Sequence, residues 1–171
     1  DMNTDFPSEQ INFLRENLPD ETRIAPYAGI YYYPINQRAE YDGKPNVLTD
    51  PNVRLALSMA LDRSIITDKI LKTGEIPAVS FVPPGMPNYP DVKVPFAGMD
   101  MKARRAKAKD LMESAGFTAS NPFQLVLRYN TSENHKRVAI AAAKMGEAIN
   151  VKTELHNADV AVHYNDIEQG D

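Results

Sequence analysis

The sequence predicts an α/β fold, and two patterns indicate it. In the last third of the chain, a run of strand-forming residues at 123–130, a helical pattern at 133–148 and a second strand at 150–155 follow one another. Such a β-α-β unit almost always has a right-handed crossover, which places its two strands parallel. Apolar residues also recur at helical spacing over 50–71 and 100–115. With 171 residues, the chain can form one compact domain or one large lobe of a bigger protein.

The first part of the chain predicts one short helix and one strand. The helix has Glu9 in its first turn, apolar residues at helical spacing after it, and Pro19 just beyond its end. Residues 23–36 are rich in β-branched and aromatic side chains, which predicts a strand. Because Pro26 and Pro34 lack a backbone N–H, we expect this strand at an edge or a bulge of the sheet.

Two consecutive helices are predicted next. Asp50 supplies an N-cap, and Pro51 has the backbone φ that a first helical turn requires. A second helix is expected from Asp62 to a closing Lys-Thr-Gly at 72–74, because basic residues and glycine suit a helix C-terminus. The pair predicts a helical hairpin or a kinked helix.

The segment 75–99 predicts a long ordered loop. It contains repeated prolines, which exclude regular elements, but also aromatic and methionine side chains, which argue against disorder. A surface helix follows over 100–115 and is expected to end at Gly116. After the β-α-β unit, residues 158–168 predict one more helix. Gly170 stands where a C-cap glycine often introduces another strand, so we expect the fold to continue past this point.

Composition excludes several classes of function. There are 19 Lys and Arg against 23 Asp and Glu, a net charge of −4, and such a surface repels a phosphate backbone. Nucleic acid is therefore not an expected partner. The absence of cysteine excludes disulfides and cysteine-ligated metals. The longest nearly uncharged stretch, residues 76–90, is interrupted by prolines and does not predict a transmembrane helix. Residues 1–5 carry no feature of a signal peptide.

No motif predicts catalysis, a cofactor or a metal. The sequence lacks a Gly-x-Ser-x-Gly elbow, a phosphate-binding loop and a paired acidic motif, so we do not expect an enzyme. His156 and His163 are seven residues apart, with acidic residues nearby, but this spacing fits no metal-binding pattern. We expect neither a metal nor a cofactor.

The most informative local pattern is Y-N-T-S-E-N-H-K-R at 129–137, where a strand meets a helix. Thr131 or Ser132 can cap the helix, and the N–H groups of its first turn, beside His135, would attract an anion such as a carboxylate. An ordinarily capped surface helix, with a partly buried His135 satisfied by a backbone partner, also explains the pattern and is the commoner case for such a helix start. The tyrosines at 31–33 either line a ligand cleft or cover a sheet edge.

Four motifs, in order, carry a family resemblance. They are D-P-N-V-R-L-A-L-S-M-A-L-D-R at 50–63, the proline-rich stretch at 74–87, A-K-D-L-M-E-S-A-G-F at 108–117 and L-R-Y-N-T-S-E-N-H-K at 127–136. Together they resemble the bacterial extracellular solute-binding proteins of the peptide/nickel ABC-transporter family. The resemblance implies a periplasmic-binding-protein-like (type II) lobe, with a mixed sheet flanked by helices. It places the end of the first lobe or a linker at 1–22 and an incomplete second lobe at 23–171.

The resemblance also implies a function and its residues. The whole protein would capture oligopeptides between two lobes in the periplasm or outside the cell, and deliver them to an ABC permease in the membrane. His135 stands where oligopeptide binders have a histidine that meets the ligand's C-terminal carboxylate. The other expected ligand-binding residues are Tyr32, Asn130, Thr131 and Ser132.

Two departures from some oligopeptide binders bear on the ligand. Pro34 stands in place of an acid and Leu71 in place of a lysine, so preference for ligand length and charge is expected to differ. We expect these 171 residues alone to bind peptides weakly or not at all, and their exposed strand edges can allow self-association. The alternatives are a stand-alone, non-catalytic interaction domain and, less favoured, a hydrolase with His135 as base.

Overall fold

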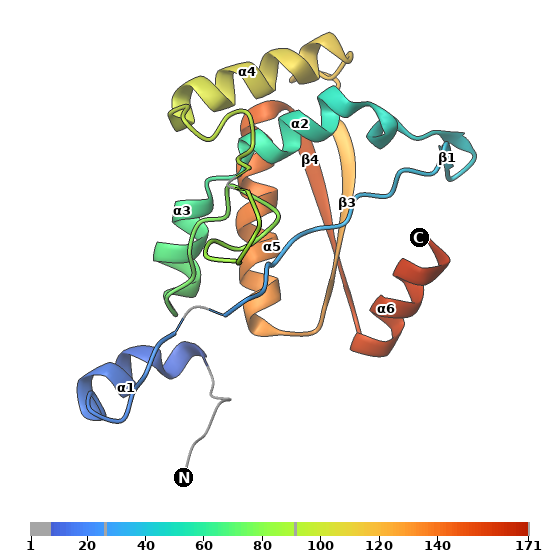
Figure 1. Ribbon diagram of the computed structural model, residues 1–171. Helices are drawn as coiled ribbons and strands as arrows, with labels where there is room; N and C mark the ends of the chain where they lie inside the picture. The colour runs from blue at the N-terminus through green and yellow to red at the C-terminus, as the bar shows by residue number, and fades with distance from the viewer. Residues whose placement is uncertain (1–7, 26, 91, 171) are drawn as a thin grey trace. The chain divides into compact units, whose positions relative to one another are not determined.

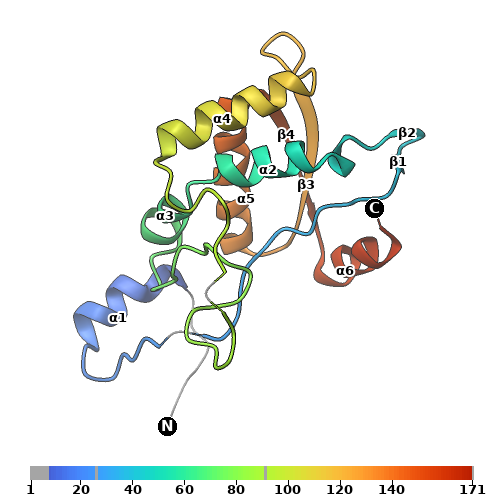
Figure 2. The same cartoon turned by 45° about the horizontal axis from the view of Figure 1, so that its top comes forward.

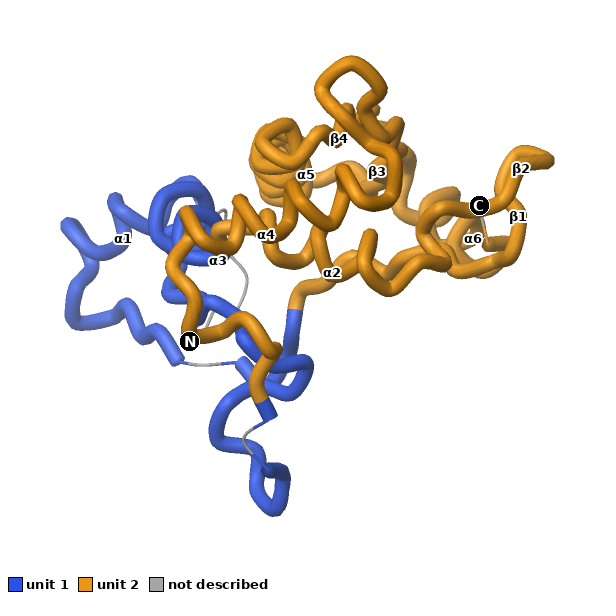
Figure 3. The backbone as a smooth tube through the Cα atoms, turned by 90° about the horizontal axis from the view of Figure 1, so that it is seen from above, with its two compact units in different colours: residues 1–30, 63–92 blue, residues 31–62, 93–171 orange. Residues whose placement is uncertain are grey.

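The computed structural model describes residues 8–25, 27–90 and 92–170. The chain divides into two compact units, one made of residues 1–30 and 63–92 and a larger one made of 31–62 and 93–171 (Figure 3). Among the described residues, no helix has the length and apolar character needed to cross a membrane.

The larger unit is built around the predicted β-α-β unit. Strands β3 (Phe123–Asn130) and β4 (Val151–Ala158) pair in parallel, with Phe123 opposite Val151 and Asn130 opposite Ala158. Helix α5 (Glu133–Gly146) and the 3₁₀ turn η4 (Glu147–Ile149) connect them, and α5 packs along both strands (Figure 1). The predicted parallel pairing is confirmed.

Helices α2 (Pro51–Ala60) and α4 (Met101–Ser114) pack against each other over η4. Both begin as the sequence predicts, because Asp50 Oδ1 accepts from Asn52 N–H and Asp100 Oδ1 accepts from Ala103 N–H, each at 2.8 Å. Their apolar faces and the start of the β-α-β unit bury one core, composed of Val53, Ala56, Met59, Ala60, Phe96, Ala108, Met112, Phe123, Ile149 and Val151. Burial of this apolar surface is the main stabilising contribution in the larger unit.

Arg104 fixes the approach to α4. Its guanidinium lies 4.9 Å from the centre of the Phe96 ring and donates to the Leu61 carbonyl at 2.8 Å. It therefore joins the C-cap of α2, the residues that precede α4, and α4 itself. At the other end α4 stops at Gly116, whose φ of +90° suits glycine, as predicted.

Polar contacts hold helix α6 (Val160–Gln169) in the larger unit. Arg128 on β3 forms a 2.9 Å ion pair with Asp166, and both side chains are mostly buried. The Asn36 amide donates to the Gly170 carbonyl at 2.8 Å. The predicted last helix is therefore confirmed, and side chains far away in the sequence attach it.

A short hairpin that was not predicted from the sequence precedes α2. Strands β1 (Glu40–Tyr41) and β2 (Lys44–Pro45) pair antiparallel around Asp42 and Gly43, whose φ values are 51° and 67° (Figure 2). Positive φ at both central residues defines the type I′ geometry that Asp-Gly favours. The 3₁₀ turn η2 (Val47–Thr49) follows, capped by the side chain of the buried Asn46.

The smaller unit contains the other predicted helices. They are the 3₁₀ turn η1 (Ser8–Gln10), α1 (Ile11–Asn17), the short α3 (Arg63–Ile65) and the π-helical turn η3 (Ile66–Leu71). The expected C-cap needs correction, because Lys72 takes the left-handed conformation (φ 65°) and its N–H donates to Thr67 O at 2.8 Å. Gly74 also has a positive φ but lies past the end of the helix.

The strand predicted over 23–36 is wrong. The described residues of this segment, which exclude Pro26, form no ladder in the structure. A strand needs a neighbour that accepts and donates backbone hydrogen bonds, and composition alone does not provide one. Side chains two residues apart still meet on one side of this segment, because the rings of Tyr31 and Tyr33 contact each other edge-on with their centres 5.6 Å apart. Residues 75–90 and 92–99 contain no helix or strand.

Candidate functional site

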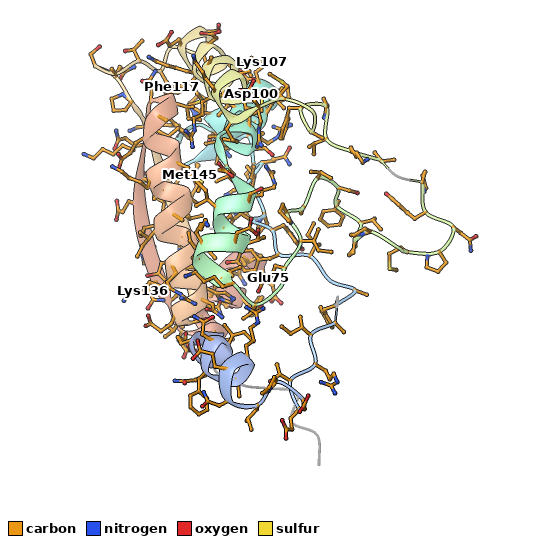
Figure 4. All side chains as sticks on the ribbon, turned by 90° about the vertical axis from the view of Figure 1, so that its left-hand side faces the viewer. Glu75, Asp100, Lys107, Phe117, Lys136 and Met145 are labelled. Atoms are coloured by element: carbon orange, nitrogen blue, oxygen red, sulfur yellow. The ribbon has the colours of Figure 1, made fainter. Side chains whose placement is uncertain are left out.

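The candidate site lies where β3 ends and α5 begins. Ser132 is the N-cap of α5, and its Oγ accepts from the backbone N–H of His135 at 3.4 Å. Its carbonyl then accepts the first helical hydrogen bond, from Lys136 N–H at 2.9 Å. The helix therefore starts where the sequence predicts, with Ser132 and not Thr131 as the cap. Figure 4 labels Lys136 at this end of α5 and Met145 toward the other.

Thr131 connects this turn to the end of β4. Its N–H donates to the Ala158 carbonyl at 2.9 Å, and its hydroxyl lies 3.0 Å from the same carbonyl and 3.1 Å from Asn157 Oδ1. The hydroxyl can donate its one proton to only one of them at a time. Thr131 therefore fixes the position of the turn relative to β4.

His135 has two side-chain neighbours. Its Nδ1 lies 2.5 Å from Oδ1 of Asn130, the last residue of β3. Its ring lies 5.4 Å from the ring of Tyr31, tilted by 44°. A backbone partner for this histidine was one expectation from the sequence, whereas the structure gives it a side-chain partner. These two contacts bring together two stretches of the chain, residue 31 and residues 130–135.

The tyrosine segment places Tyr31, rather than Tyr32, against His135. Tyr31 is 51% exposed and Tyr32 is 56% exposed. Burial raises the pKa of Tyr31, and it raises the pKa of Tyr33 more strongly. The Tyr33 hydroxyl is buried, and among the described residues it has no hydrogen-bond partner. After burial, the neighbouring Tyr31 side chain is the second cause of the raised pKa of Tyr33.

The charges around this turn suit an anion. Ser132 Oγ is engaged by the backbone N–H of His135, as expected for an N-cap. The basic side chains of Lys136 and Arg137 follow His135, and the positive end of the α5 dipole lies there. The turn therefore favours a negatively charged group.

Other predicted features lie elsewhere. In the described part of the chain, no group of three or more His, Cys, Asp or Glu side chains is arranged to hold a metal ion. His163 contacts Tyr164 on α6, with ring centres 5.5 Å apart. A shallow hollow of about 360 Å³, lined by Pro122, Ala143 and Lys152 among others, lies at the start of β4 and does not include His135.

Comparison with known proteins decides the family. All of residues 1–171 match the model of the bacterial extracellular solute-binding proteins, family 5 Middle. The chain belongs to this family. It is 36% identical over 160 residues to the periplasmic murein peptide-binding protein MppA of Escherichia coli, covering 93% of this chain. It is also 36% identical over 167 residues to the periplasmic oligopeptide-binding protein OppA of Salmonella typhimurium, covering 96% of this chain.

Solved structures of family members agree with the fold. The murein tripeptide binding protein MppA of Escherichia coli superimposes with a TM-score of 0.87 and 35% identity, over 97% of this chain and 32% of that one. Haemophilus influenzae OppA in complex with RPPGFSPFR gives a TM-score of 0.82 and 31% identity, over 97% and 32%. These matches confirm the predicted α/β fold of the periplasmic binding proteins. The chain spans about 30% of the length of the curated relatives named above.

Proposed function

We propose that the protein is the substrate-binding component of an ABC importer that captures oligopeptides between two lobes. Family membership supports this proposal, as do the relatives MppA and OppA, which are named for binding murein peptides and oligopeptides. The observation that carries it is the placement of His135 at the start of α5, held by Asn130 and Tyr31.

In this proposal the turn at the start of α5 binds the C-terminal carboxylate of the peptide. His135 supplies a side-chain donor, and the positive end of α5 favours the negative charge. Asn130, Thr131 and Ser132 form the turn that presents His135. The tyrosine segment, Tyr32 included, provides aromatic surface with polar tips, which suits peptides of varied sequence.

The wider setting is also part of the proposal. The protein acts in the periplasm or outside the cell and delivers its peptide to a permease, through which it associates with the membrane. It binds without chemical change of the peptide, in keeping with the engagement of Ser132 by the backbone of α5 instead of by the His135 ring.

Calorimetric titration of the full-length protein tests the proposal. We expect tri- to pentapeptides with free C-terminal carboxylates to bind more tightly than the same peptides with C-terminal amides. His135→Ala should weaken the binding of the free acids by about tenfold, since a hydrogen bond to a charged group contributes about 1.5–3 kcal/mol, and should affect the amides less.

Lys144→Ala is the matched control, because Lys144 lies near the other end of α5, where its ammonium pairs with Glu147. This variant should bind as the unchanged protein does. Equal losses for acids and amides in His135→Ala would remove the carboxylate role, and no binding of any peptide would remove the peptide class.

A further inference from the structure

The contact between Asn130 and His135 determines more than the position of a ring. The Nδ1 of His135 and the Oδ1 of Asn130 are 2.5 Å apart, and both side chains are partly buried. An amide oxygen has no proton to donate, so a hydrogen bond between these atoms requires the proton to be on Nδ1. The hydrogen bond made by one ring nitrogen of a histidine decides the tautomer and therefore the state of the other nitrogen.

We propose that Asn130 is a positioning residue that holds His135 as its Nδ1–H tautomer and leaves Nε2 to the ligand. This inference rests on the proposed function, because it takes His135 as the carboxylate-binding residue. With Nδ1–H committed to Asn130, Nε2 is the ring atom that remains for a peptide carboxylate. In the neutral ring Nε2 carries a lone pair, so it donates to the carboxylate only in the doubly protonated ring, whose Nδ1–H remains bonded to Asn130 Oδ1.

Two further contacts fix the ring in this orientation. The Tyr31 ring lies 5.4 Å from the imidazole and limits its rotation from one side. The backbone of His135 is fixed because its N–H donates to the cap residue Ser132. Asn130 itself belongs to the ladder of β3, opposite Ala158 of β4, so its side chain projects from a rigid element.

The opposite arrangement of the amide would have a different consequence. If the Asn130 amide nitrogen donated to Nδ1, the neutral ring would carry its proton on Nε2. The two arrangements are therefore distinguished by the tautomer of His135, which nitrogen NMR reports directly. This readout does not depend on a bound peptide, so it remains informative if the proposed function fails.

The first experiment is NMR of the full-length protein labelled with ¹⁵N-histidine, without peptide, at about pH 8.5, where an ordinary histidine is neutral. The loss of signals in His135→Gln identifies those of His135. We expect the proton on Nδ1 in the unchanged protein and in Asn130→Asp, which keeps an acceptor. In Asn130→Ala we expect it to move to Nε2, while the signals of His156 and His163 stay unchanged.

Asn134→Ala is the matched control. Asn134 precedes His135 directly, but its Oδ1 accepts from Arg137 at 2.5 Å. This variant should leave the His135 tautomer as it is. A proton on Nε2 in the unchanged protein, or a tautomer that Asn130→Ala does not alter, would overturn the inference.

The second experiment separates positioning from direct contact with the peptide. We expect Asn130→Ala to weaken the binding of free-acid peptides by about fivefold, the equivalent of one hydrogen bond. In a His135→Ala background it should cause no further loss. A further loss in that background would mean that Asn130 binds the peptide itself. If no peptide binds at all, the proposed function fails, and the tautomer measurement still decides the role of Asn130.

Discussion

Arg104 offers the sharpest test of how the larger unit is held together. It donates to Leu61 O at 2.8 Å and lies over the Phe96 ring at 4.9 Å. A hydrogen bond from a charged donor contributes about 1.5–3 kcal/mol, and a cation–π contact at a partly exposed site about 0.5–1 kcal/mol. Burial lowers the pKa of Arg104, against the attraction of Asp62, which indicates a desolvation cost that offsets part of this gain. We expect Arg104→Met to reduce the free energy of unfolding by about 2 kcal/mol.

Urea unfolding followed by circular dichroism measures this change. Arg104→Lys should lose about half as much, because lysine keeps the charge but not the planar fork. The matched control is Lys107→Met, since Lys107 lies exposed on the same helix (Figure 4). The reasoning is refuted if Arg104→Met stays within about 0.5 kcal/mol of the unchanged protein, the range of ordinary surface substitutions.

Two further predictions concern burial. Burial raises the pKa of Tyr33, so its neutral form contributes stability that is fully present below the unfolded-state pKa of 10.0. This contribution is lost progressively as the pH rises from that value toward the pKa of the folded state. Urea unfolding at about pH 8 and pH 11 should therefore show a smaller alkaline loss for Tyr33→Phe than for the unchanged protein, and equal losses would contradict this assignment. Met112 is fully buried in the core, and Met112→Ala should reduce the free energy of unfolding by about 2–5 kcal/mol. A loss no greater than that of Met101→Ala, a partly exposed methionine of the same helix, would oppose the core described above.

Local patterns predicted the elements that local forces define. Asp50 and Asp100 cap their helices through contacts within three residues, and Gly116 ends α4 because of its own backbone conformation. The same holds for the β-α-β unit, whose strands pair in parallel because a helix connects them. Each of these features requires only information present in a short window of sequence.

The elements that failed depend on distant partners. The segment 23–36 has the composition of a strand but no ladder partner in its described part. Asp42-Gly43 is a turn signal for the hairpin, but the two strands are only two residues long and exposed. They therefore show no alternation of apolar and polar residues that would predict a strand.

The candidate site was predicted only in part. The strand-to-helix turn and His135 could be identified from the motif at 127–136, and Ser132 as one of two cap candidates. Alternation places Tyr31 and Tyr32 on opposite faces but does not decide which one faces His135. The contact between Asn130 and His135 spans the junction of a strand and a helix, where neither the side-chain period of a strand nor that of a helix predicts which residues meet.

The parallel register of β3 and β4 has a consequence for how this family can vary in sequence. Both strands are eight residues long and end level with each other, at Asn130 and Ala158. Successive residues of a strand face opposite sides, so the loss or gain of a single residue within β3 would turn Asn130 away from the histidine. Insertions and deletions should therefore collect in the connection between α4 and β3, around residues 117–122, where the chain can absorb them without changing the side of the sheet that Asn130 faces.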